Sequence, residues 1–236
     1  MLAIDVSTSM LAEDLKPNRL EAAKDVAAEF INGRPNDNIG ITLFAGETFT
    51  QCPLTVDHAV LLDMIHNIKC GLITDGTAVG MGIANAVTRL KDSKAKSKVI
   101  ILLTDGTNNK GDISPMTAAE IAKSFGIRVY TIGVGTNGMA PYPYPVGNTV
   151  QYVSMPVEID EKTLTEIAGT TDGNYFRATS NSKLKEVYEE IDKLEKTKLN
   201  VKEYSKRDEE YHWFALAAFL CVLLEVLLRN SVLKKI

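Results

Sequence analysis

The sequence has little cysteine and little histidine. It holds three residues of each among 236. Cys52 and Cys70 stand too far apart for a Cys-x-x-Cys metal or redox motif. They could pair in an exported domain, but we expect two free, mostly buried thiols. His58 and His66 lie eight positions apart, which is not zinc-ligand spacing, so we expect surface or packing roles for both.

Excess positive charge is also missing. The formal net charge is −4, so no global basic face exists and we expect no nucleic-acid partner. No charged leader and no cleavage site precede the first apolar run. If Met1 is the natural start, the domain is expected in the cytoplasm. If the chain is a piece of a longer one, its first residue says nothing about where the domain is located.

Apolar, β-branched runs alternate with amphipathic segments along the chain. Near-continuous apolar strands between helices indicate a parallel sheet covered on both faces. A turn at Gly46–Glu47 predicts an antiparallel edge strand at about 48–52. The sequence therefore predicts an α/β, doubly wound, mostly parallel central sheet. The expected strands are 2–6, 39–45, 99–104, 127–134 and 174–177, and the expected helices are 19–33, 56–68, 78–91, 115–125, 160–169 and 181–195.

Residues 1–195 are expected to form this domain. A stretch rich in proline and tyrosine, at about 136–157, predicts a surface insertion, with a small hairpin as one possibility. It contains GVGTNG (133–138), which fits a dinucleotide-binding pattern. That site requires a helix to open there, and the prolines at 141, 143 and 145 forbid one. Residues 196–210 carry charges of both signs and predict a solvated connector.

The segment 211–233 predicts a transmembrane helix, followed by a basic tail at 234–236. Its apolar core, residues 213–228, would span roughly 24 Å as a helix, somewhat less than a bilayer core of about 30 Å. A buried core helix is the alternative, but the domain is complete without it. Trp213 at one end and Arg229 at the other resemble interfacial anchors. Glu225 stands four positions before Arg229, the favourable order for a side-chain pair.

Hard oxygen ligands follow several of the predicted strands. Asp5, Ser7 and Ser9 follow the first strand, Thr77 lies in a glycine-flanked loop before a helix, and Asp105 ends a central strand. In a doubly wound sheet these loops meet at the carboxyl ends of the strands. Two carboxylates and three hydroxyls suit Mg²⁺, with Ca²⁺ or Mn²⁺ as alternatives. A third carboxylate, from another molecule, would be attracted to the remaining open position.

The ordered set DVSTSM, GTAVGMGI and LLTDGTNN resembles the metal-ion-dependent adhesion site of von Willebrand factor type A (VWA) domains. The resemblance covers nearly all of residues 1–195. It implies that the metal ligands are Asp5, Ser7, Ser9, Thr77 and Asp105. The motif TDGT occurs twice, and the resemblance leaves Asp75 and Thr107 as loop-shaping residues.

A closer resemblance is carried by FTQCPLT, KSKVIILLTDGTNN, FGIRVYTIGVGT, DEKTLTEIA and the terminal apolar segment. These are similar to BatA-type proteins, the aerotolerance-related group of bacterial membrane-anchored VWA proteins. This implies a protein-binding module on the bacterial inner membrane, with its domain in the periplasm. The implied partners are a protein that offers Asp or Glu to the metal, other VWA membrane proteins and a MoxR-type ATPase.

An enzyme is the competing interpretation. A metal-assisted hydrolase, such as a phosphatase, could use the same Asp and Ser cluster, but it would require a general base beside the metal. Asp5 as a phosphoryl-accepting nucleophile lacks the usual second acid, since Ser7 stands two positions on. No serine or cysteine triad is evident. The sequence therefore favours a binding module that is not an enzyme.

Overall fold

The computed structural model describes residues 1–136, 138–147, 149–157 and 159–204, together with 216, 218, 219 and 222. Contacts divide the chain into a compact unit, Met1–Glu195, and a second unit, Lys196–Ile236. The strands and the candidate site belong to the first unit.

Six strands form the central sheet in the order β3-β2-β1-β4-β5-β8. All neighbours pair in parallel except β2 and β3, which are antiparallel. The predicted mostly parallel sheet with an antiparallel edge strand is thereby confirmed. The strands are β1 (Leu2–Asp5), β2 (Ile39–Phe44), β3 (Thr48–Thr55), β4 (Lys98–Thr104), β5 (Ile127–Val134) and β8 (Tyr175–Ala178).

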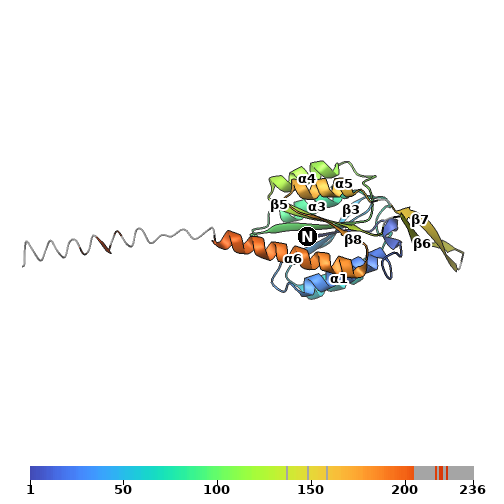
Figure 1. Cartoon of the computed structure of the whole chain (residues 1–236), viewed down its shortest axis with the longest axis horizontal. Helices are drawn as coiled ribbons and strands as arrows, with labels where there is room; N and C mark the ends of the chain where they lie inside the picture. Colours follow the sequence, from blue (N-terminus) through green and yellow to red (C-terminus); the bar gives the residue numbers. More distant parts are fainter. Residues whose placement is uncertain are drawn as a thin grey trace, which may run out of the picture. The chain divides into compact units, whose positions relative to one another are not determined.

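Helices cover both faces of this sheet (Figure 1). One core cluster joins the sheet to α1, α2 and α6, and the other joins it to α3, α4 and α5. Because both faces are covered, the inner strands are apolar at most of their positions, as the sequence indicated. The helices are η1 (Thr8–Leu11), α1 (Arg19–Asn32), α2 (His58–His66), α3 (Val79–Leu90), α4 (Pro115–Ser124), α5 (Glu161–Thr170) and α6 (Asn181–Tyr204).

Side-chain caps fix where several helices begin. Asn18 accepts a hydrogen bond from the backbone N–H of Glu21, and Asp57, Ser114 and Asp160 play the same role for α2, α4 and α5. Such caps satisfy N–H groups that the first helical turn leaves unpaired. The cap at Asn18 sets the position of Arg19, the first residue of α1.

The proline- and tyrosine-rich insertion is a hairpin of β6 (Gly138–Val146) and β7 (Thr149–Val157), which form a separate two-stranded sheet (Figure 1). Its root is tied to the body, since the backbone N–H of Glu13 donates to Pro141 O at 2.8 Å. A strand follows GVGTNG, so the helix that a dinucleotide site needs does not form. Several apolar side chains of the hairpin are exposed, among them Tyr144, Tyr152 and Met155.

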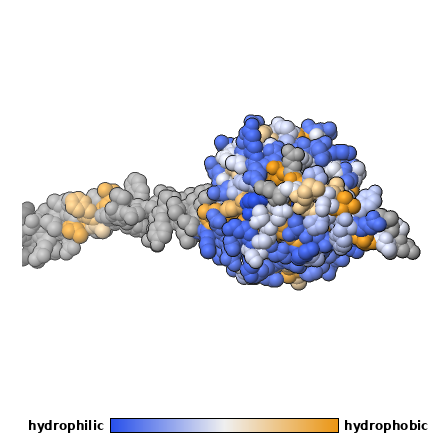
Figure 2. All heavy atoms as spheres, turned by 45° about the vertical axis from the view of Figure 1, so that its right-hand side comes forward, coloured by the Kyte–Doolittle hydropathy of each residue, from blue (hydrophilic) through white to orange (hydrophobic). Residues whose placement is uncertain are grey.

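On the face shown in Figure 2, hydrophilic side chains cover most of the surface and apolar ones form small patches. Cys52 and Cys70 are both free thiols, the former buried and the latter partly buried.

The predictions for the C-terminal part of the chain fall mostly outside the described residues. Helix α6 continues to Tyr204, into the predicted connector, whereas 205–210 lie outside the described part of the chain. The predicted membrane segment 211–233 also lies outside it, except for four residues. Among the described residues, none of the helices has the length and apolar character to cross a membrane.

A buried ion pair closes the carboxyl end of the compact unit. Glu195 is 4% exposed and accepts hydrogen bonds from Arg128, from the Tyr130 hydroxyl at 2.6 Å and from the Ser97 hydroxyl at 2.8 Å. Arg128 and Tyr130 belong to β5, and Ser97 immediately precedes β4. This Glu195 clamp therefore fastens α6 to the amino ends of two central strands.

Removing the clamp should destabilise the domain. In Glu195→Ala, Arg128 keeps its charge but loses its carboxylate, and breaking a buried pair in this way costs about 3 kcal/mol or more. Glu190→Ala is the matched control, because Glu190 is exposed on the same helix. It should change the free energy of unfolding by no more than about 0.5 kcal/mol. Urea denaturation measures both, and equal small losses would contradict the role of the clamp.

The clamp should also lose its effect in acid. Burial alone would raise the pKa of Glu195, but hydrogen bonds from Arg128, Tyr130 and Ser97 outweigh it and lower the pKa from its ordinary value of 4.5. A carboxylate with a lowered folded-state pKa stabilises the fold above its unfolded-state pKa, and that stabilisation is lost as the pH falls. The difference in unfolding free energy between wild type and Glu195→Gln should therefore shrink below pH 4.5. A difference that stays constant with pH would exclude this linkage.

Candidate metal centre

The predicted ligands lie where the order of the strands in the sheet reverses. Strands β2 and β3 lie on one side of β1, and β4, β5 and β8 lie on the other, so the switch point falls between β1 and β4. Ligand sites of open α/β sheets form at the carboxyl ends of the strands at such a point. Asp5 ends β1 and Asp105 directly follows β4, so the two carboxylates flank it.

Direct hydrogen bonds join four of the five predicted residues. The Ser7 and Ser9 hydroxyls lie 2.9 Å apart, and the Ser9 hydroxyl donates to Asp105 Oδ1 at 2.7 Å. The backbone N–H of Ser7 donates to Asp5 Oδ1 at 2.9 Å. The short helix η1, which follows Ser7, turns the chain so that the two serines face the same carboxylates.

Thr77 joins the cluster through its loop. Its N–H donates to Asn109 Oδ1 at 2.9 Å, and its carbonyl accepts from the N–H groups of Asn109 and Lys110. A Cβ placed on Gly106 would lie 3.3 Å from the Thr77 hydroxyl oxygen. The hydroxyl therefore lies against the residue that follows Asp105, and the structure brings all five predicted residues to one place.

Both carboxylates are buried, Asp5 at 0% and Asp105 at 2% exposure. Burial, followed by the charge of nearby Asp105, raises the pKa of Asp5 to about 7. Burial also raises the pKa of Asp105, although the Arg19 guanidinium opposes this. Taking two acids out of water at one point is costly, and positive charge beside them relieves that cost.

The residues fit a hard divalent cation. Two carboxylates and three hydroxyls are the oxygen donors that Mg²⁺, Ca²⁺ and Mn²⁺ prefer. Across the described residues, no group of three or more His, Cys, Asp or Glu side chains forms a possible metal site. The candidate centre depends on hydroxyl donors, and it would offer a bound ion only two anionic ligands.

Three residues of the site were not apparent from the sequence. Thr104 donates its hydroxyl to Asp5 Oδ2 at 2.6 Å, and Arg19 Nη1 donates to Asp105 Oδ2 at 2.7 Å. Asp14 accepts from Arg19 Nε at 2.7 Å and Nη2 at 2.6 Å. Burial opposes ionisation of Asp14, but hydrogen bonds from Arg19 and Thr136 lower its pKa to about 2.

Asp75, which the resemblance leaves out of the ligand set, supports a neighbouring loop. Its two carboxylate oxygens accept from the Thr8 backbone N–H at 3.0 Å and from the Thr8 hydroxyl at 2.8 Å. These bonds hold the chain between Ser7 and Ser9. Thr107 is exposed.

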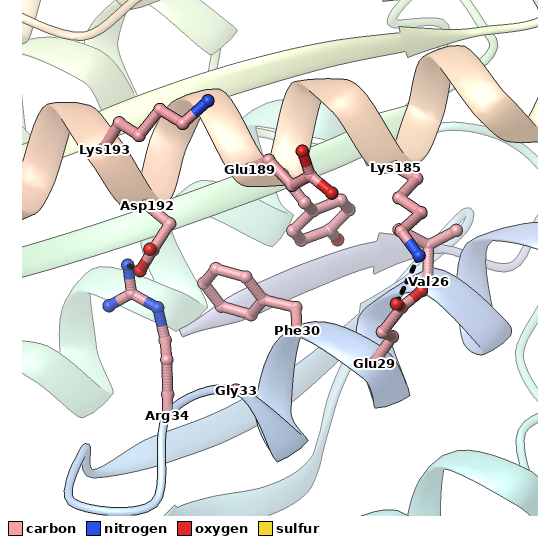
Figure 3. A pocket seen from close by; sticks show the side chains of 10 residues that line it. Val26, Glu29, Phe30, Gly33, Arg34, Lys185, Glu189, Asp192 and Lys193 are labelled. Atoms are coloured by element: carbon pink, nitrogen blue, oxygen red, sulfur yellow. Dashed lines mark hydrogen bonds and ion pairs between the residues drawn. The ribbon is translucent and has the colours of Figure 1, made fainter.

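A pocket of about 390 Å³ lies elsewhere, between α1 and α6 (Figure 3). The rings of Phe30 and Tyr188 line it, with centroids 5.0 Å apart. Ion pairs between the two helices, Lys185–Glu29 at 2.5 Å and Arg34–Asp192 at 2.6 Å, stand at its sides. None of the predicted ligands lines this pocket, so it is separate from the candidate metal centre.

Curated relatives match most or all of the chain. A protein of Borreliella burgdorferi is 27% identical over the whole chain, which covers 70% of that protein. A UPF0353 protein of Mycolicibacterium paratuberculosis is 32% identical over 80% of the chain, which covers 57% of its length. The chain thus spans little more than half to about two thirds of these relatives.

Solved structures share the fold. BatB from Bacteroides thetaiotaomicron is 34% identical, with a TM-score of 0.72 over 83% of this chain and 97% of that one. An aerotolerance-related membrane protein from Bacteroides fragilis is also 34% identical, with a TM-score of 0.70 over 82% and 98%. Proximal thread matrix protein 1 of the mussel byssus has a zinc-occupied metal-ion-dependent adhesion site (MIDAS) motif. It is 26% identical, with a TM-score of 0.62 over 80% of this chain and 43% of that one.

The family model of the von Willebrand factor type A domain matches residues 1–190. That range contains the central sheet, the hairpin and every predicted ligand. The similarity of the chain to BatB and to an aerotolerance-related membrane protein agrees with the resemblance to aerotolerance-related VWA proteins that the sequence motifs carry. This chain therefore belongs to the von Willebrand factor type A domain family.

Proposed function

We propose that the chain is a divalent-metal-dependent protein-binding module whose ligands are Asp5, Ser7, Ser9, Thr77 and Asp105. The observation that carries the proposal is the convergence of two fully buried carboxylates with three hydroxyl groups at the switch point of the sheet. The mussel protein with a zinc-occupied site of this type supports a metal at the same motif. Mg²⁺ suits the oxygen donors here best, with Ca²⁺ or Mn²⁺ as alternatives.

Hydrogen bonds within the protein hold the proposed ligands in position. The Ser7 N–H and the Thr104 hydroxyl hold the two oxygens of Asp5, and Ser9 links Ser7 to Asp105. A bound divalent ion supplies a Lewis-acidic position whose charge two carboxylates only just balance. An Asp or Glu side chain of a partner protein is the hard anionic ligand that suits the remaining position. Capture of that side chain is the proposed activity.

A hydrolase is less well supported. Metal-assisted hydrolysis requires a general base near the metal. The two histidines of α2 make other contacts: His58 Nε2 lies 2.9 Å from Asp37 O, and His66 Nδ1 lies 2.7 Å from Leu62 O. Asp5 and Asp105 are assigned to the ion. We therefore propose a binding module and not an enzyme.

We further propose that residues 211–233 anchor the chain in the bacterial inner membrane, with the domain in the periplasm and the tail 234–236 in the cytoplasm. Similarity to an aerotolerance-related membrane protein supports a membrane location. The apolar segment supplies the means, and the basic residues after it suit a cytoplasmic tail. The proposed setting is a membrane complex linked to aerotolerance or stress, with other VWA proteins and a MoxR-type ATPase.

A saturating ion should stabilise the fold. With Mg²⁺ at about a hundredfold excess over its dissociation constant, the free energy of unfolding should rise by about 2.7 kcal/mol relative to EDTA. Asp5→Asn keeps the shape of the side chain and removes its charge, so the Mg²⁺ effect should disappear. Asp92→Asn is the matched control, because Asp92 is exposed in the turn after α3, away from the proposed ligands, and this variant should respond as wild type does. Thermal and urea unfolding with and without Mg²⁺ measure the effect.

Two results would end this proposal. One is a wild-type chain that is equally stable in Mg²⁺ and in EDTA. The other is an Asp5→Asn variant that Mg²⁺ stabilises as much as wild type.

The membrane segment should determine where the chain is found. Expressed in bacteria as part of its natural gene product, the chain should remain with the membrane pellet after a high-salt wash, which screens purely electrostatic attachment. Residues 1–236 expressed by themselves should also pellet, whereas residues 1–210 expressed by themselves should be released. Protease added to spheroplasts should digest residues 1–195 if the domain is periplasmic. Protection of the domain would place it in the cytoplasm instead, and a full-length product in the soluble fraction would refute the anchor.

A further inference from the structure

One buried cation lies beside the proposed ligands. Arg19 is 2% exposed and begins α1. Its guanidinium donates to Asp105 Oδ2 through Nη1 and to both oxygens of Asp14 through Nε and Nη2. Gly135, at a φ of +129°, lies against the same group, since a Cβ there would be 2.6 Å from Nη2. The guanidinium is thus held in one position.

The charges at this point do not balance. The side chains of Asp5, Asp14 and Asp105 are buried, and Arg19 is the cation paired with two of them. With all three carboxylates ionised, as metal binding requires, they and the guanidinium carry a net charge of two negative. A divalent ion brings that sum to zero, so the arrangement suits a divalent cation with Arg19 in place.

Arg19 and the ion nevertheless compete for one carboxylate. Ser9 already donates to Asp105 Oδ1, and Arg19 donates to Oδ2 at 2.7 Å. An ion at the proposed ligands would share Asp105 with a positive charge in a buried environment, where charges interact more strongly than in water. Arg19 therefore stabilises the metal-free domain and opposes the ion.

We propose that Arg19 is an affinity-determining residue of the metal site, which keeps the metal affinity of the isolated domain low. The inference rests on the proposed function of that site. A partner carboxylate would give the ion a further anionic ligand and so reduce its dependence on Asp105, which Arg19 shares, and metal and partner would therefore each strengthen the binding of the other. Residues that only held the fold together would have the opposite effect on the ion, because their loss would loosen the site.

The first test removes the buried pair as a unit. Arg19→Met combined with Asp14→Asn avoids leaving the Asp14 carboxylate without its partner. Isothermal titration of the full chain with Mg²⁺ should show affinity about tenfold higher than wild type. Because tighter binding stabilises the folded state more at the same ion concentration, the Mg²⁺-induced increase in Tm of the double variant should be larger than that of wild type.

Two further variants separate charge from packing. Arg19→Gln keeps an amide donor and loses the charge, and it should also bind Mg²⁺ more tightly. It serves as the main test if the double variant fails to fold in EDTA, as judged by near-UV circular dichroism. Arg19→Lys keeps the charge and loses the bidentate geometry, and its affinity should stay near that of wild type.

The outcomes distinguish this inference from the proposed function. Mg²⁺ binding by wild type, with equal or weaker binding by both charge-removing variants, would overturn the role of Arg19 and leave the metal site intact. Weakened binding by Arg19→Lys and Arg19→Gln alike would show a purely structural residue. An absence of Mg²⁺ binding in every chain would overturn both proposals. Binding by the charge-removing variants alone would support the role of Arg19 in its strongest form.

Discussion

Two carboxylates, Asp5 and Asp105, are buried next to each other at the point where strand order reverses between β1 and β4. The rest of the site follows from the cost of that burial. Every donor around them, whether hydroxyl, backbone N–H or guanidinium, offers positive charge density to a carboxylate oxygen. The parallel sheet makes this possible, because its carboxyl edge brings together loops that follow strands distant in sequence.

The need to pair every buried charge also explains how charged residues can lie inside the domain at two opposite ends. At the carboxyl edge, Arg19 is enclosed between Asp14 and Asp105. At the amino edge, Glu195 lies among Arg128, Tyr130 and Ser97. Each buried charge has an oppositely charged partner and further hydrogen bonds, which is the condition under which a buried charge is tolerated. The apolar sheet separates the two clusters, so one can serve binding while the other serves the fold.

Much of this could be predicted from the sequence, because the relevant signals are local. Apolar runs with helical segments between them specify the order of elements, and a polar residue at a strand end specifies the edge on which it lies. Arg19, Asp14 and Thr104 were not predicted, because their roles depend on contacts that are not local. Arg19 looks like an exposed residue in the first turn of a helix, and Thr104 like the last residue of an apolar strand. Their partners are supplied by segments far away in the chain, and local patterns do not encode such contacts.

Gly135 illustrates how far the demands of the site extend. It offers no ligand and has no side chain, and its left-handed φ already favours glycine. Any side chain there would also meet the Arg19 guanidinium, which bonds to Asp105. In evolutionary terms, position 135 is not free to vary by itself. A larger residue would need a change at position 19 and would still carry the backbone strain of a positive φ, so a residue that reaches the candidate metal centre only through Arg19 is restricted twice over.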